Sequence, residues 1–233
     1  MAEDSLRQPV GRSLVGWTKP PRPGRAALSG RFCQIEPLNA GLHADELFSA
    51  NSADEAGRMW TYLPYGPFAA RAEYDAWMQR TCCGEDPLFY AICDVNTGRP
   101  AGLAAYLRID PANGVIEIGH LAYSPALQRT TAATEAMFLM IDHVFALGYR
   151  RCEWKCDSLN VPSRAAAERL GFTHEGVFRQ AVVVKGRNRD TAWFSIIDTE
   201  WPARRAAIVR WLAPENFDGS GQQIARLAAR SAT

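Results

Sequence analysis

The sequence lacks long apolar segments and an excess of charge of either sign. No hydrophobic run approaches the roughly 20 residues that a membrane-spanning helix needs. The segment Met1–Ser13 has no apolar core, so we expect no secretory signal. With 26 basic and 25 acidic residues, the net charge of +1 favours neither nucleic acid nor an anionic membrane as a partner. We therefore expect a cytoplasmic protein.

Motifs for metals and nucleotides are missing as well. Six cysteines occur, but none forms C-x-x-C and no histidine pair stands nearby at zinc-ligand spacing, so we expect buried thiols and no metal. The phosphate loop G-x-x-x-x-G-K-[ST] is absent, and we find no internal repeat. What remains is a chain of 233 residues, 47% hydrophobic and 22% charged, with ample material for one core.

Composition divides the chain into three regions. Residues 1–30 are rich in Pro, Gly and Arg and are expected to form an extended arm without a core of its own. Residues 31–212 carry alternating strand and helix patterns and are expected to form one domain. Residues 213–233 follow as a C-terminal appendix.

A strand, a tight turn and a helix stand at the centre of this domain. Ile, Val and Tyr predict a strand over 115–123, and Pro125 ends it. Apolar residues at helical spacing predict a helix over 129–147, which Gly148 ends. Small residues at the start of this helix would let a phosphate approach its free amides. An ordinary capped helix start is the alternative.

Periodicity and turn signals predict the remaining elements. Antiparallel hairpins are indicated by the turns at 95–100 and 111–114, whereas the strand at 150–156 follows a helical crossover and should pair parallel to 115–123. The expected strands are 31–36, 88–94, 101–109, 115–123, 150–156, 172–184 and 191–198, and the further helices are 40–50, 69–80, 165–170 and 201–212.

Two motifs resemble the GNAT superfamily of acyl-CoA-dependent N-acetyltransferases. The first is its Q/R-x-x-G-x-G/A turn, matched by Gln128, Arg129, Ala132 and Ala133, with Thr131 in place of a glycine. The second is N-x-x-S followed by L-G-F and E-G, a pattern closest to the ribosomal-protein N-terminal acetyltransferases. Its matching residues are Asn160, Ser163, Leu170, Gly171, Phe172, Glu175 and Gly176.

The resemblance covers roughly residues 30 to 200. It implies an α/β (α+β) fold of the GNAT type. Its mixed and mostly antiparallel central sheet would be flanked by helices and splayed after the central strand.

The resemblance also implies acetyl-CoA as the cofactor. The backbone of Leu121, Ala122 and Tyr123 would pair with the pantetheine arm and polarise the thioester carbonyl. Asn160 would bond the pantetheine or fix the local turn, and Ser163 would contact the same cofactor. The pyrophosphate would bind at the turn formed by Gln128, Arg129, Thr130, Thr131, Ala132 and Ala133, with Arg129 as a phosphate partner.

Acetylation of an amine requires a base, because an amine with a pKa near 10 is mostly protonated at neutral pH. Glu117 is the first candidate, since a charge in an apolar strand is costly without a purpose or a partner, although it could simply face solvent. His120 is the rival, on the opposite strand face unless a bulge intervenes. By resemblance Ser163 would be the leaving-group acid, with Tyr123 as a substitute. The alternative for Ser163 is a capping hydroxyl.

The acceptor cleft is expected between the loop 60–68 and the hairpin 178–193. Trp60, Tyr62, Tyr65 and Phe68 suit a partly apolar amine or a peptide N-terminus, and simple packing is the alternative. Binding of a carboxylate on the acceptor is expected of Arg179, Arg187 and Arg189, with a solvated basic turn as the alternative.

The sequence thus predicts an N-acetyltransferase that acts on a small amine or a protein N-terminus by direct attack in a ternary complex. We expect a monomer or homodimer without nucleic-acid or membrane partners. The alternative is a non-catalytic acyl-CoA-binding or protein-interaction domain of the same fold. Thr131 and Ala167 favour it, because both depart from the family pattern.

Overall fold

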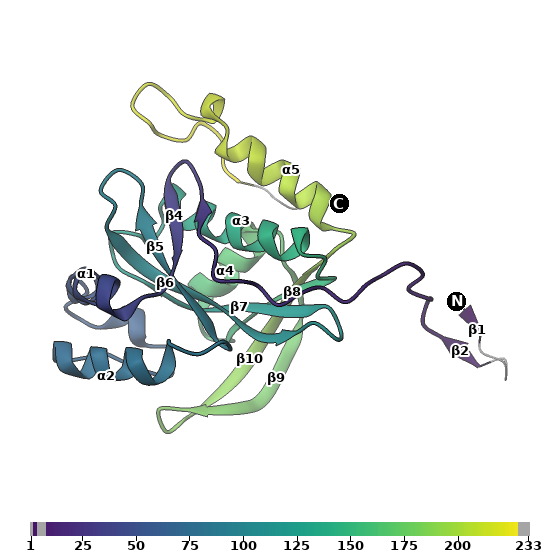
Figure 1. The fold of residues 1–233 in the computed structure, drawn as a ribbon, viewed down its shortest axis with the longest axis horizontal. Coiled ribbons are helices and arrows are strands. Elements are labelled where there is room, and N and C mark those ends of the chain that lie inside the picture. The colour runs from purple at the N-terminus through teal and green to yellow at the C-terminus, as the bar shows by residue number, and fades with distance from the viewer. Residues whose placement is uncertain (1, 4–7, 228–233) are drawn as a thin grey trace.

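An eight-stranded sheet organises the domain in the computed structural model, which describes residues 2–3 and 8–227 (Figure 1). Its order is β3-β4-β5-β6-β7-β8-β10-β9, and its neighbours pair antiparallel except β7 and β8. The predicted parallel pair is therefore confirmed. The strands are β3 Leu28–Ser29, β4 Cys33–Pro37, β5 Leu88–Asp94, β6 Pro100–Asp110, β7 Val115–Tyr123, β8 Arg151–Asp157, β9 Thr173–Val184 and β10 Arg187–Ile197.

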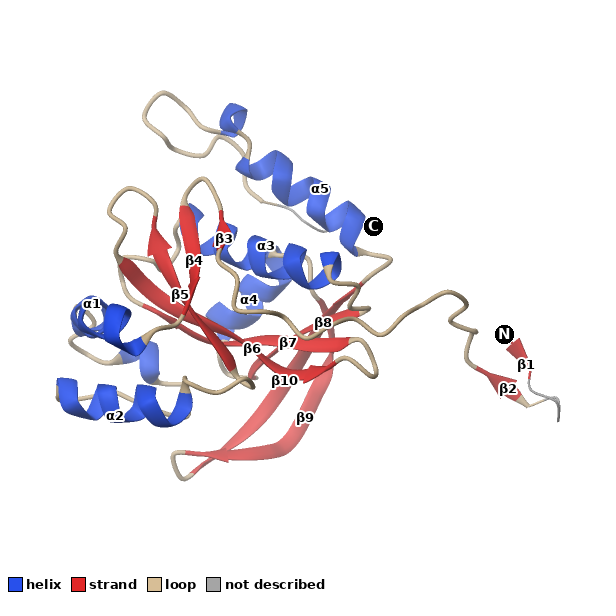
Figure 2. Ribbon diagram, viewed as in Figure 1, coloured by secondary structure: helices blue, strands red, loops and turns tan. Residues whose placement is uncertain are grey.

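Helices cover both faces of this sheet (Figure 2). α1 and α2 lie on one face, α3 and α4 on the other, and α5 packs outside α3. The central strand β5 shows why: Phe89 and Ala91 point into the core under α1 and α2, while Tyr90 and Ile92 point into the core under α3. The helices are α1 Ala40–Ser52, α2 Arg71–Thr81, α3 Thr131–Ala146, α4 Val161–Arg169 and α5 Trp201–Leu212, with short 3-10 turns at Arg58–Trp60 and Pro214–Asn216.

Two elements begin earlier than the sequence predicted. α4 starts at Val161 instead of 165, because the Asn160 side chain caps it and accepts a hydrogen bond from the Ser163 amide. β10 starts at Arg187 instead of 191, because Lys185 and Gly186 both have positive φ and close a two-residue hairpin turn. The basic hairpin is therefore tighter than expected.

The sheet opens between β7 and β8, as predicted. Their parallel ladder ends at the pair Glu117 and Glu153. Beyond it, His120 has a φ of +52°, and His120 and Leu121 together stand opposite Ala104 of β6. This bulge strengthens the twist of β7 and turns it away from β8. The backbone edge of β7 that faces β8 is therefore open beyond residue 117.

The two ends of the chain pack partly against the domain. β1 Ala2–Glu3 and β2 Pro9–Val10 pair in an arm that projects from the body (Figure 1). Further along, Tyr90 Oη donates a hydrogen bond to the Gly24 carbonyl at 2.7 Å, and β3 joins the sheet, which thus takes in the end of the predicted arm 1–30.

At the other end, the Phe217 ring lies 5.2 Å from Phe32, so the described part of the appendix packs on the domain. Residues 228–233 of the appendix, like residues 1 and 4–7 of the arm, lie outside the described residues. Within the described part of the chain, no helix has both the length and the apolar character needed to cross a bilayer.

Candidate active site

A cavity of about 460 Å³ lies where β7 and β8 separate. Its walls come from the loop at 59–64, from β6, β7 and β8, from the start of α4, and from the hairpin β9–β10. The predicted loop and hairpin therefore face each other across one space. Apolar side chains such as Leu63 and Trp193 share this lining with charged ones such as Glu117 and Lys155.

Glu117 is the buried carboxylate of this cavity. Its side chain is 5% exposed and contacts the guanidinium of Arg108 and, at 2.9 Å, the ammonium of Lys155. Lys155 is equally buried, lies 2.6 Å from Glu153 and sits 3.7 Å above the Trp193 ring. The alternative in which Glu117 faces solvent is therefore wrong, since the carboxylate is buried between two cations.

The charges continue from this group across the sheet. Arg151 contacts Glu153 at 2.7 Å and forms a two-pronged ion pair with Glu175, which also accepts a hydrogen bond from Ser195. Hydrogen bonds to Glu175 raise the pKa of Arg151, and the same bonds lower the pKa of Glu175. Opposite charges thus alternate from β6 to β9, which lowers the cost of holding them out of water.

Sequence reasoning missed Lys155, although a signal was present. In the strand segment RRCEWKC, the charged residues Arg151, Glu153 and Lys155 occupy one face and Cys152 and Trp154 the other. A strand with charges on one face is normally solvated. Here the carboxylates of Glu117 on β7 and Glu175 on β9 reach the same face, so the charges form pairs with one another.

His120 also reaches the cavity, because the bulge brings it there together with Glu117. Its ring stacks with Tyr65 at 5.7 Å between centroids, and its Nδ1 lies 3.2 Å from the Tyr65 hydroxyl. Burial, and secondarily the charge of Arg108, lower the pKa of His120 to about 4. At neutral pH it is therefore an uncharged hydrogen-bonding group.

The turn before α3 has the features that anion binding requires. Thr130 caps the helix by accepting a hydrogen bond from the Ala133 amide at 3.1 Å, which leaves the amides of Thr131 and Ala132 without intrahelical acceptors. Arg129 is exposed in a left-handed conformation with a φ of +62°. Gln128 donates to the Tyr123 carbonyl at 2.8 Å and so ties this turn to the end of β7.

Ser163 and Tyr123, the two candidates for the leaving-group acid, occupy different environments. Ser163 lines the cavity, and its Oγ accepts a hydrogen bond from the Trp154 indole at 3.0 Å. The Tyr123 ring packs against the core beneath α3, and within the described residues its hydroxyl has no hydrogen-bond partner. Burial raises the pKa of Tyr123. The structure thus brings Ser163 and Asn160 to the cavity and keeps the Tyr123 side chain away from it.

Of the four loop aromatics, Tyr62 lines the cavity. Its hydroxyl donates to the Leu159 carbonyl at 3.1 Å across the space. Trp60 and Phe68 instead pack together at 5.3 Å, and Tyr65 packs against Trp77 at 4.4 Å. Packing, the alternative noted for this loop, thus describes the surroundings of Trp60 and Phe68. The loop also meets the hairpin, because Lys185 Nζ donates to the Trp60 carbonyl at 2.8 Å.

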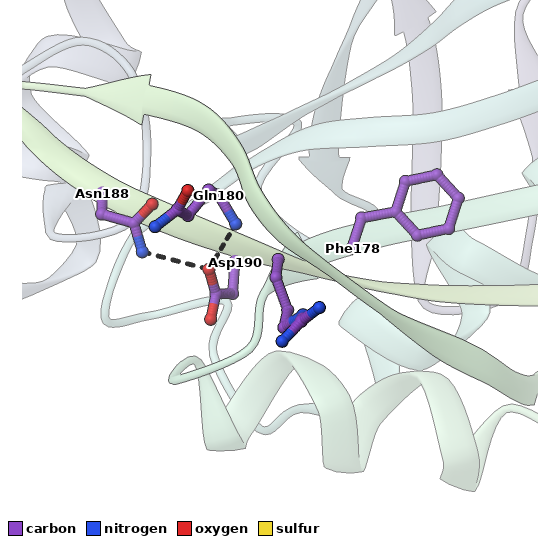
Figure 3. Close-up of a pocket in the computed structure, with 5 residues that line it drawn as sticks. Phe178, Gln180, Asn188 and Asp190 are labelled. Carbon is purple, nitrogen blue, oxygen red and sulfur yellow. Dashed lines mark hydrogen bonds between the residues drawn. The ribbon is translucent and has the colours of Figure 1, made fainter.

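Arg179 lines a separate, open hollow on the outer side of the hairpin. In this hollow the Asp190 carboxylate accepts hydrogen bonds from the Gln180 amide at 2.7 Å and from Asn188 at 3.0 Å (Figure 3). Gln180 has a φ of +49° at an irregularity in the β9–β10 ladder. Because residues alternate along β10, Arg189 faces the cavity while Asp190 faces this outer hollow.

A further group of potential metal ligands lies elsewhere. Among the described residues, Glu36, His43 and Cys93 place their ligand atoms within 4.8 Å of one another. However, His43 Nδ1 accepts a hydrogen bond from the Asn39 amide, so the neutral ring carries its proton on Nε2 and donates it to Glu36. Burial raises the pKa of Cys93 to about 12. These bonds favour a structural role for the cluster.

Comparison with known proteins identifies the class of protein to which this fold and cavity belong. Residues 34–173 match the family described as an acetyltransferase (GNAT) domain, so the chain belongs to the GNAT family. It carries an acyltransferase domain of that type, as the two sequence motifs predicted.

Three relatives show how far the similarity extends. A GCN5-related N-acetyltransferase from Brucella melitensis has 54% sequence identity and a TM-score of 0.89, with 92% of this chain and 97% of that chain covered. A protein from Chromobacterium violaceum, described as a probable acetyltransferase of the GNAT family, has 44% identity and a TM-score of 0.79 over 84% of this chain and 98% of that one. An uncharacterised N-acetyltransferase p20 from Bacillus licheniformis is 32% identical over 48% of this chain, and the match spans 63% of that protein.

More distant structures share the fold. A presumed ribosomal-protein-serine acetyltransferase from Vibrio cholerae has 21% identity and a TM-score of 0.64, over 74% of this chain and 97% of that one. The microcin C7 self-immunity acetyltransferase MccE, solved in complex with acetyl-CoA and AMP, has 22% identity and a TM-score of 0.63, over 72% of this chain and 93% of that one. At these identities the likeness concerns the fold.

Proposed function

We propose that this protein transfers the acetyl group of acetyl-CoA to a primary amine by direct attack in a ternary complex. The observation that carries the proposal is the open edge of β7, which leads from the buried Glu117 to the turn before α3. One end of this path has a carboxylate, and the other has free amides and an exposed arginine. An amine acceptor and a phosphate-bearing thioester donor require this combination.

The residues along the path fit acetyl-CoA. The amides of Thr131 and Ala132, with Arg129 beside them, would hold the pyrophosphate. The open backbone edge at 121–123 would hydrogen-bond the pantetheine and polarise the thioester carbonyl. Asn160, which caps α4, would support the pantetheine of acetyl-CoA near the start of that helix. The solved complex of the same fold with acetyl-CoA supports this assignment of the donor.

Glu117 acts in the proposed reaction as the proton acceptor. The amine nitrogen bonds to the acetyl carbon, the C–S bond breaks, and Glu117 takes the proton lost by the amine, directly or through a water. Ser163 can give a proton to the departing thiolate, because its hydroxyl faces the cavity while its oxygen accepts from Trp154. His120 is assigned a positioning role, since its lowered pKa makes it a weak base.

The acceptor is proposed to be a small amine or the N-terminus of a peptide. The mixture of apolar and charged residues in the lining supports an acceptor with both characters. The presumed function of the Vibrio cholerae protein motivates the peptide alternative. A cytoplasmic location and a monomeric or homodimeric state are part of the same proposal.

Thermal unfolding with and without acetyl-CoA tests the proposal. At a ligand concentration of about 100 Kd we expect a stabilisation of about 2.7 kcal/mol and a rise in Tm of several degrees. The double variant Arg129→Ala/Asn160→Ala should lose most of this rise, whereas Arg80→Ala, an exposed arginine on α2, should keep it. If neither acetyl-CoA nor CoA raises the Tm, acetyl transfer is ruled out as the function.

The second candidate is a non-catalytic acyl-CoA-binding domain. It is favoured by Ala167, which is fully buried at the position where many family members have a tyrosine. Release of CoA with a panel of primary amines separates the two functions. A catalyst releases CoA in proportion to the amine, whereas a binding domain shows the rise in Tm and no release above the rate without enzyme.

A further inference from the structure

Three polar groups of β10 face the cavity without a partner. They are Arg189 Nε, Thr191 Oγ1 and Trp193 Nε1, which alternate along the strand and therefore share one face. Each atom is shielded from solvent, and within residues 2–3 and 8–227 none has a hydrogen-bond partner. Thr191 is 5% exposed. Buried polar groups are nearly always paired, with protein or with ordered water, so three unpaired ones on one cavity wall mark a place where a polar ligand or water would complete them.

The chemistry of the three groups is that of donors. A guanidinium and an indole N–H can only donate, and a hydroxyl donates when its neighbours do not. The other two cations of the cavity, Arg108 and Lys155, are already paired with Glu117. Arg189 makes no ion pair within 4.0 Å in the described part of the chain, which leaves its positive charge available.

The two carboxylates that line the cavity already have partners. Glu117 is held by its two cations, and Asp157 accepts a hydrogen bond from the Leu159 amide at 2.9 Å. In register, Trp193 stands opposite Lys155, and Thr191 opposite Asp157, with Arg189 one step further along β10. Glu117 and its two cations thus lie toward the Trp193 end of this wall and Arg189 toward the other end, and four residues of strand, about 13 Å, separate the Cα atoms of Trp193 and Arg189.

We propose that the acceptor is an amine that also carries a carboxylate, bound by Arg189 with the Thr191 hydroxyl and the Trp193 indole N–H. This inference rests on the proposed acetyl transfer and names its substrate class. Arginine binds carboxylates through two parallel hydrogen bonds, which fixes the orientation as well as the position of the ligand. The amine then lies toward Glu117 and the carboxylate toward the hairpin.

A matched series of acceptors tests the assignment. The series consists of unbranched ω-amino carboxylates, in which a methylene chain of increasing length separates the amine from the carboxylate, each paired with its primary carboxamide. We expect the wild-type enzyme to prefer the carboxylate of the best length by about 10- to 100-fold in kcat/KM, as one charged hydrogen-bonded contact gives. Arg189→Gln should abolish the preference by raising the KM of the carboxylate alone, and the KM of acetyl-CoA should not change.

Two further variants locate the effect. Thr191→Val and Trp193→Phe should each reduce the preference by a smaller factor, because each removes one uncharged donor. Arg179→Gln is the matched control: it removes an arginine from the outer face of the same hairpin and should keep the wild-type ratio. Circular dichroism of each variant confirms folding.

A measurement without turnover completes the test. Calorimetry with CoA present compares the N-acetylated carboxylates with their carboxamides on the wild type and Arg189→Gln. A carboxylate preference that Arg189→Gln removes, in either assay, supports the proposal. Equal use of both acceptor types, an undiminished preference in Arg189→Gln, or no binding of any member overturns it. If acetyl-CoA still raises the Tm in that last case, the donor site of the proposed function stands and only the acceptor class fails.

Discussion

The ion pair between Lys155 and Glu117 bridges β7 and β8 immediately beyond the last backbone pair of their ladder. Glu117 is the last ladder residue of β7, and Lys155 lies two residues past its partner Glu153 on β8. A charged contact of 2.9 Å thus spans the point where the backbone hydrogen bonds stop. The same two side chains link the two strands and place a carboxylate in the cavity.

Replacement of Glu117 by glutamine should remove proton transfer and preserve shape. We expect kcat to fall by about 10²- to 10⁴-fold, the range that general bases contribute. The rise in Tm with acetyl-CoA should persist, because the proposed donor site lies at the other end of β7. Steady-state kinetics with the best acceptor measures the effect, and a kcat within about threefold of the wild type would assign the base to another group.

Replacement of Lys155 by methionine should act mainly on stability. It leaves Glu117 and Glu153 buried on neighbouring strands with a shared cation removed, and breaking a buried pair typically costs about 3–5 kcal/mol. Urea unfolding measures the free energy. In the double variant Glu117→Gln/Lys155→Met, we expect the loss in the free energy of unfolding to be smaller than the sum of the losses in the two single variants, since both changes remove the same contact. Strict additivity would show that the two charges are independent.

His120 should make stability depend on pH below neutrality. Its pKa is about 4 in the folded protein and 6.5 for an unperturbed imidazole, so between these values the unfolded chain binds more protons. Stability therefore rises with pH through this window, and lowering the pH from about 7 to about 5 should cost about 2 kcal/mol at this site. His120→Asn removes the titration and tolerates the positive φ. Urea unfolding at both pH values should show a smaller difference for the variant than for the wild type.

Glu135 on α3 should be a sensitive position for stability. Its carboxylate accepts hydrogen bonds from the amides of Arg31, Phe32 and Cys33, at 2.9, 2.6 and 2.9 Å. Glu135→Gln offers one acceptor oxygen and turns an N–H group toward those donors, so we expect a loss of about 2–4 kcal/mol. Glu168→Gln, an exposed change on α4, should stay within about 0.5 kcal/mol. Equal melting temperatures for the two variants would contradict this expectation.

The sequence predicted the order and type of the main elements because their periodicity reflects burial on one face or two. The segment at 88–94 is apolar throughout, and the strand it forms is buried on both sides. The start of α4 was harder to predict, because the capping hydrogen bond of Asn160 determines where this helix begins. Strand alternation also failed at His120, since a bulge shifts the face of each later residue.

The candidate site was predicted less completely, for a different physical reason. Trp60 and Phe68 have the composition of a ligand-binding loop, and composition does not distinguish packing against other aromatics from packing against a ligand. Lys155 belongs to the site because it contacts Glu117 and Trp193, which lie on strands distant in sequence. Arg179 and Arg189 are the same residue type in one hairpin, so the sequence alone does not show which of them faces the cavity. In the folded hairpin Arg189 lines the cavity and Arg179 lines the outer hollow.

The three amides that converge on Glu135 also have a mechanical meaning. α3 cannot slide along β4 without releasing these three bonds, so we expect the helix and this side of the sheet to move together. The amides at the start of the helix should therefore keep their position when the proposed donor binds. The loop 60–68 is attached more lightly: one hydrogen bond joins it to the hairpin β9–β10 at Lys185, and one joins it to Leu159 before α4, so we expect a displacement that admits an acceptor to occur there.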